Sequence, residues 1–175
     1  RPATTSTAAA ESAPLYRPFL IAALIMTVTL GALLGAHNLL ALHVGTPAFV
    51  PALNPIHGAA QVWGFVFLFI IGVAYHAFPR FVGANLRPRT LARSSLWLAL
   101  VGITLATIGR AAGTSQFAGA LCLLGSLSTF AATAAFATVL AATWRAASPA
   151  PDPFHRFLAA GTFWWLVAAA LLVVQ

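Results

Sequence analysis

The sequence predicts an all-α membrane protein, a polytopic bundle of five transmembrane helices with its N-terminus inside. The first reason is composition: of 175 residues, 61% are hydrophobic and only 6% are charged, with a mean hydropathy of +0.92. Soluble domains carry roughly 25% charged residues, so this chain has too few to cover a surface in water. The other reasons are five long apolar runs and a regular placement of arginines between them.

Each apolar run is long enough to form a membrane-spanning helix. A helix needs about 20 apolar residues to cross a bilayer, and in lipid it must satisfy its own backbone polar groups. The segments that qualify are approximately residues 18–43, 57–78, 91–112, 117–143 and 154–174. Before them, residues 1–14 form a polar Ala/Thr/Ser/Pro tail that we expect to be disordered, and residues 15–175 form the transmembrane domain. Because the chain starts without methionine and ends within an apolar run, it is either processed or part of a longer chain or larger complex.

The arginines orient the bundle. The chain has nine arginines and no lysine, and Glu11 and Asp152 are its only acids. Arginines occur in the tail and gather in the second and fourth connections, whereas the first connection has none and the third has only Arg110. By the positive-inside rule, the N-terminus and the arginine-rich connections lie inside. We therefore expect a multi-pass protein of the bacterial inner membrane, with lipid and other helices or subunits as partners. Membrane topology explains the net charge of +7 better than nucleic-acid binding does.

Two further features of composition narrow the function. The run 117–143 is rich in Ala, Gly, Ser and Thr, and small residues allow helices to approach closely in lipid. Both acids lie outside the apolar runs, which argues against a proton pump or ion-coupled transporter, because these usually need carboxylates at membrane depth. Nor does the sequence contain a catalytic triad motif, a phosphate-binding loop or a zinc-ligand spacing.

The second run carries a candidate cofactor site at its start. A helical residue turns about 100° and rises about 1.5 Å, so Gln61 and Gly64 follow His57 on one face, which continues to Leu68 and Tyr75. This order suits a flat macrocycle: His57 as axial ligand, Gln61 as a hydrogen-bonding group and Gly64 as the point of close approach. The helix dipole keeps a histidine at this end neutral, the form that binds metal. In the alternative interpretation, His57 is an interfacial residue that completes the preceding turn.

The other histidines are weaker candidates. His37 lies deep in the first run and could face His57, so it is the candidate for a second ligand. His76 lies 19 residues after His57, about 100° round the helix and roughly 28 Å along it, so we expect an interfacial residue. We expect the same of His43 and His155.

Two stretches resemble a known family. Residues 16–34, "YRPFLIAALIMTVTLGALL", resemble the opening of the NnrS family. Residues 56–81, "IHGAAQVWGFVFLFIIGVAYHAFPRF", resemble the second helix of that family and of the haem–copper oxidase subunit I superfamily. The resemblance covers about residues 16–110, and the matching positions are His57, Gly58, Gln61, Gly64, Gly72, Pro79 and Arg80. It implies that His57 is an axial ligand of a low-spin haem. Ala59 stands where the family's second histidine is found. The family's remaining haem and copper ligands come from later helices, which a complete chain of five spans would lack and which the missing half of a longer chain would carry.

The leading hypothesis is therefore an integral membrane protein that binds one haem b through His57, with His37 or another subunit as second ligand. Its role is electron transfer or nitric oxide–related haem chemistry, with a quinone or cytochrome as redox partner. Any enzymatic role is at most that of a redox component, because the ligands of a dinuclear centre are incomplete and copper is not supported. The alternative is a structural, assembly or pigment-binding subunit of a larger membrane complex, in the last case with a chlorin on His57 or His37.

Overall fold

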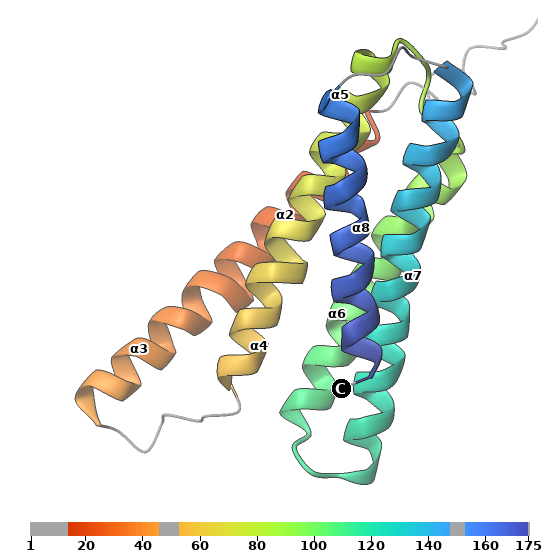
Figure 1. The fold of residues 1–175 in the computed structure, drawn as a ribbon. Coiled ribbons are helices and arrows are strands. Elements are labelled where there is room, and N and C mark those ends of the chain that lie inside the picture. Colours follow the sequence, from red (N-terminus) through yellow and green to blue (C-terminus); the bar gives the residue numbers. More distant parts are fainter. Residues whose placement is uncertain (1–13, 46–52, 148–152, 175) are drawn as a thin grey trace, which may run out of the picture.

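The computed structural model describes residues 14–45, 53–147 and 153–174, and in this part of the chain all regular structure is helical (Figure 1). Five helices in these ranges are long and apolar enough to cross a membrane: Tyr16–Val44, Leu53–Val82, Arg89–Ala111, Gln116–Ala147 and Pro153–Val173. The five predicted runs are thus confirmed as helices. The second helix differs most from its predicted bounds, since it starts at Leu53 and extends through Pro79 to Val82. Residues 1–13, where the disordered tail was predicted, lie outside the described ranges.

The first two long helices each contain a π-helical segment in the middle. The first consists of α2 (Tyr16–Met26), η1 (Thr27–Leu33) and α3 (Leu34–Val44), and the second of α4 (Leu53–Ala59), η2 (Ala60–Phe67) and α5 (Leu68–Val82). The two π segments contact each other. A π turn bonds each N–H five residues back, so it shifts the direction of every later side chain relative to a continuous α-helix.

The third and fourth helices, α6 (Arg89–Ala111) and α7 (Gln116–Ala147), form the most closely packed pair. Glycines bring their backbones together. A Cβ on Gly125 would lie 2.6 Å from the Ala106 backbone nitrogen, and one on Gly102 would lie 2.4 Å from Thr129 Oγ1. The close approach predicted from the small residues of 117–143 is confirmed.

Aromatic side chains fill the centre of the bundle. Tyr75 of α5 packs its ring against Phe19 of α2 and Phe136 of α7, and its hydroxyl lies 3.0 Å from Ser95 Oγ of α6. Further along the same helix, Trp63 contacts Trp165 of α8 (Pro153–Val173) at 5.1 Å between ring centroids. The second helix is thus the central element, in contact with each of the others.

The outer parts of the bundle are α3 and α8. Figure 1 shows α3 diverging from α6, α7 and α8, and α3 packs mainly on α4. Apart from His37 and His43, its exposed side chains are apolar, as are many of those on α8. Exposed apolar side chains on long helices are the surface that lipid or neighbouring helices cover in a membrane.

One end of the bundle gathers nearly all of the described arginines. Contacts between Tyr16 and His76 and between Phe81 and Phe154 bring the starts of α2 and α8 to the end of α5. The seven arginines at or near this end are Arg17, Arg80, Arg87, Arg89, Arg93, Arg145 and Arg156. Arg110, at the end of α6, is the one described arginine at the opposite end. His57 lies at that opposite end, because Ala59 and Arg110 line the same small cavity.

Candidate functional site

The imidazole of His57 is held against the first helix. Its Nδ1 lies 2.9 Å from the carbonyl oxygen of Gly31. A carbonyl oxygen only accepts hydrogen bonds, so Nδ1 carries a proton, and in the neutral imidazole Nε2 then has a free lone pair. The approach requires a glycine on the facing helix, because a Cβ on Gly35 would lie 2.6 Å from His57 Cε1.

The π segment η1 helps to present the acceptor for this bond. The Leu34 N–H is directed at the carbonyls of both Thr29 and Gly31, the first of these five residues back. The Gly31 carbonyl oxygen thus has two donors, the backbone N–H of Leu34 and the Nδ1–H of His57, and a carbonyl oxygen has two lone pairs to accept them. Gly31 also has no side chain to screen its carbonyl. Local helix geometry and the absence of a Cβ therefore create the place where His57 binds.

The two residues predicted to follow His57 on its face both meet the first helix. Gln61 packs over Gly31, where a Cβ would lie 3.0 Å from Gln61 Nε2. Gly64 meets the Met26 side chain, whose Cβ would be 3.0 Å from a Cβ on the glycine. The structure thus brings His57 and Gln61 together at the helix pair, and the surface of Gly64 is covered by Met26.

Beyond Gly64 the face that meets the first helix differs from the α-helical spacing that we predicted, because it includes Gly72, and Tyr75 contacts both Phe19 of the first helix and α6. Gly72 follows Gly64 against the first helix, where a Cβ would lie 2.9 Å from Phe19 Cβ. Leu68 is fully buried in the core, and Tyr75 reaches Ser95 on α6. The reason is the π segment η2, which changes the helical phase between His57 and these later residues.

A recess of about 220 Å³ adjoins His57 between α3 and α4. Two asparagines line it with the histidine: Asn38 Nδ2 donates to Asn54 Oδ1 at 3.0 Å. Asn38 is only 6% exposed, and its Oδ1 atom is buried without a hydrogen-bond partner. A buried amide oxygen in this state is a polar group that a bound molecule or water would pair with. An asparagine in an apolar run needs a polar partner, so the sequence alone could have indicated that Asn38 takes part in a site.

His37, predicted as the second ligand, lies elsewhere on the helix surface. It is exposed and does not line the recess, whereas its neighbour Asn38 does. Successive helical residues point about 100° apart, so only one of the two can face α4. Among the described residues, no group of three or more His, Cys, Asp or Glu side chains gathers as a metal site.

The remaining histidines take three different places. His43 is exposed at the end of α3, and His76 packs edge-on against Tyr16 with ring centroids 4.2 Å apart. His155, at the start of α8, is only 5% exposed and packs against Trp144 at 4.1 Å. The start of α8 folds onto α7 and covers the ring, both of whose nitrogens lack a hydrogen-bond partner.

No family model, curated protein or solved structure matches the chain. The function proposed below therefore rests on the geometry around His57 and on the sequence patterns described above.

Proposed function

We propose that this protein is an integral membrane protein that binds one haem b through His57 and serves in electron transfer or nitric oxide–related haem chemistry. The observation that carries the proposal is the hydrogen bond from His57 Nδ1–H to the Gly31 carbonyl. Histidines that bind metal almost always donate their other ring N–H to a carbonyl or carboxylate. Such a bond fixes the tautomer and the ring orientation, and it increases the basicity of the ligating nitrogen.

The residues around His57 fit one side of a haem site. His57 would hold the iron, Gly31 would orient the imidazole, and Asn38 and Asn54 would supply amide groups at the edge of the recess. When bound, a haem supplies one-electron redox chemistry or binds a diatomic ligand. The recess of about 220 Å³ is smaller than the roughly 300–1,000 Å³ of pockets that enclose a ligand. The recess would therefore hold only part of a haem, and a helix of another subunit, or of a second copy with its His37, would have to complete the site.

The membrane setting supports the same proposal. The five helices have the length and hydropathy of membrane spans, and seven described arginines lie at one end. With this end inside a bacterial inner membrane, the positive-inside rule puts the N-terminus inside and His57 near the outer face. The resemblance to NnrS and haem–copper oxidase helices supports a histidine ligand at that position. A quinone or a cytochrome would then be the redox partner.

The test is an absorption spectrum of the purified protein, oxidised and reduced, with matched variants. His57→Asn is the informative change, because an asparagine amide can still donate to Gly31 but cannot replace Nε2 as a ligand. We expect a Soret band in the wild type, its loss in His57→Asn, and its retention in the control His43→Asn. Added imidazole should restore the band in His57→Gly. A Soret band unchanged in His57→Asn would refute His57 as the ligand.

A second candidate is a structural subunit of a larger membrane complex. It is favoured by the polar contacts between the first two helices, since His57 with Gly31 and Asn38 with Asn54 already link them. Interhelical hydrogen bonds of this kind stabilise membrane bundles without a cofactor. Purified protein that has no Soret band after expression with ample haem, and that co-purifies with other membrane subunits, would favour this candidate over the first.

A further inference from the structure

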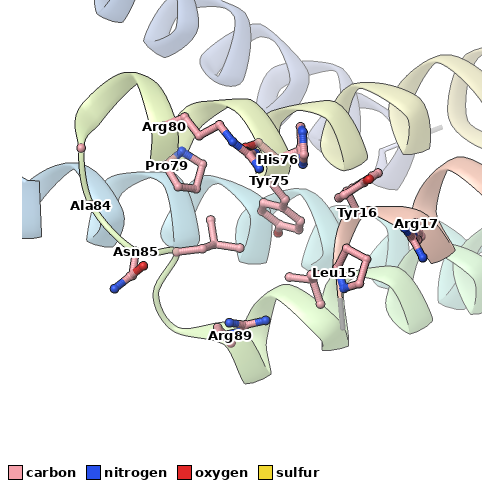
Figure 2. A pocket seen from close by; sticks show the side chains of 13 residues that line it. Leu15, Tyr16, Arg17, Tyr75, His76, Pro79, Arg80, Ala84, Asn85 and Arg89 are labelled. Atoms are coloured by element: carbon pink, nitrogen blue, oxygen red, sulfur yellow. The ribbon is translucent and has the colours of Figure 1, made fainter. Parts of the chain in front are cut away.

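A second polar recess lies at the end of the bundle opposite to His57. Its volume is about 650 Å³. Its walls come from the start of α2, the end of α5, the turn that follows and the start of α6 (Figure 2). These are the ends of membrane-spanning helices, so the recess lies at the depth where the bilayer changes from hydrocarbon to headgroups.

Three arginines from three different helices line this recess. Arg17 belongs to α2, Arg80 to α5 and Arg89 to α6, and all three are exposed. Figure 2 shows Arg80 and Arg89 on opposite sides of it. Arg80 also donates to the His76 carbonyl, which fixes the direction of its guanidinium group.

No carboxylate is available in the described ranges to neutralise these charges. The chain has only two acids, Glu11 and Asp152, and both lie outside residues 14–45, 53–147 and 153–174. Three guanidinium groups around one open space repel one another, and the repulsion is reduced when an anion binds between them. Guanidinium groups also match phosphate oxygens with paired hydrogen bonds.

The backbone at two helix starts adds partial positive charge to that of the arginines. Both α2 and α6 start at the recess, and neither start has a side-chain cap or an acidic residue in its first turn. The start of a helix has unpaired N–H groups and a partial positive charge, so it favours an anion. The end of α5, which also lies at the recess, carries the opposite partial charge, so the net positive charge there comes mainly from the three arginines.

A separate apolar groove between α5 and α8 is lined by Phe69 and Val73 of α5 and by Phe154 of α8. Phe69 and Val73 each lie seven residues before His76 and Arg80, respectively, which places them about two turns deeper on the same face. Their side chains are 40% and 42% exposed. The site therefore combines a cationic recess with a neighbouring apolar surface, as an amphiphile requires. A free phosphate ion would use only the cationic recess.

We propose that this recess binds the phosphate of an anionic phospholipid, with an acyl chain lying along the groove of Phe69 and Val73. Basic pockets between transmembrane helices are the form that lipid headgroup sites take in membrane proteins. Tyr16 and His76, whose rings pack together at the recess, border the headgroup position. The site uses no residue near His57, so the proposal of lipid binding does not depend on haem binding.

The experiment is native mass spectrometry of the full chain in mild detergent. The probes are dioleoyl phosphatidylglycerol, dioleoyl phosphatidylcholine and inorganic phosphate. The recess variant replaces three arginines: Arg17→Gln, Arg80→Gln and Arg89→Gln. The matched control removes the same charge from three arginines that do not line the recess: Arg93→Gln, Arg110→Gln and Arg156→Gln.

We expect the wild type to bind phosphatidylglycerol at least tenfold more tightly than phosphatidylcholine. Each lost arginine should weaken phosphatidylglycerol binding by roughly tenfold, as for a hydrogen bond to a charged group. The recess variant should lose the preference and the control should keep it. Single variants measured alongside the triple, with far-UV circular dichroism on each, distinguish lost binding from lost folding.

Two results would overturn the proposal. If the recess variant and the control bind phosphatidylglycerol equally, the arginines act only through net charge. If inorganic phosphate binds as tightly as phosphatidylglycerol and displaces it, the site is one for a free anion and not for lipid.

Discussion

The substitution Gly35→Ala should disturb the site at His57 without touching the histidine itself. A Cβ at this position would lie 2.6 Å from His57 Cε1 and 3.1 Å from Nδ1. Ordinary contacts of a Cβ atom are 3.4–4 Å, so the ring must retreat by about 0.8 Å or the two helices must separate. Either movement would lengthen the 2.9 Å bond from His57 Nδ1 to Gly31 beyond the roughly 3.2 Å limit of a good hydrogen bond.

Three contributions determine the change in the free energy of unfolding, two of them unfavourable and one favourable. Overpacking costs about 1–3 kcal/mol, and loss of a hydrogen bond costs about 0.5–1.5 kcal/mol. Replacing glycine with alanine inside a helix returns about 1 kcal/mol. Gly35→Ala should therefore lower the free energy of unfolding by about 0.5–3.5 kcal/mol. It should also weaken or shift the Soret band, since the ligand loses its orientation.

Gly58→Ala is the matched control, because Gly58 is adjacent to His57 and a Cβ there would have no heavy atom within 4 Å. It should leave the spectrum unchanged and stabilise the helix by up to about 1 kcal/mol. The assay is thermal unfolding in detergent together with the absorption spectrum of each variant. If Gly35→Ala matches Gly58→Ala in both, His57 is not held against the first helix as described.

Two further substitutions test the packing of the bundle. Gly125→Ala should destabilise the protein by about 1–3 kcal/mol, because its Cβ would lie 2.6 Å from the backbone nitrogen of Ala106, whereas Gly119→Ala on the same helix meets nothing within 4 Å and should not. Unfolding of both in detergent gives the comparison, and equal stabilities would contradict the close contact of α6 and α7. Tyr75→Phe should cost about 1 kcal/mol in the same assay through loss of the bond to Ser95, and a neutral result would show that this bond contributes nothing.

The five helices could be predicted because their cause is local. A run of about 20 apolar residues in lipid has few alternatives to a helix, and breakers mark its ends. The close approach of α7 to a neighbouring helix was also predictable, since the run 117–143 is rich in Ala, Gly, Ser and Thr, although its partner α6 was not. Both predictions needed no knowledge of how the helices face one another.

The details of the candidate site could not be predicted because they depend on helical phase. The π segments η1 and η2 rotate the residues that follow them, and nothing in the apolar pattern shows that they are present. Their effect explains why Tyr75 reaches α6 as well as the first helix. Asn38, which follows η1, is the residue that faces α4 in place of its neighbour His37. The burial of His155 beneath Trp144 likewise depends on where α8 crosses α7.

The gathering of arginines at one end also has an electrical consequence. Of the eight described arginines, seven lie at that end and one at the other, so the two ends differ by six positive charges. On an energised membrane, moving one elementary charge across 100 mV changes the free energy by about 2.3 kcal/mol. The two directions of insertion would thus differ by about 14 kcal/mol per 100 mV. Once the helices have crossed, we expect the potential itself to hold the arginine-rich end on the negative side.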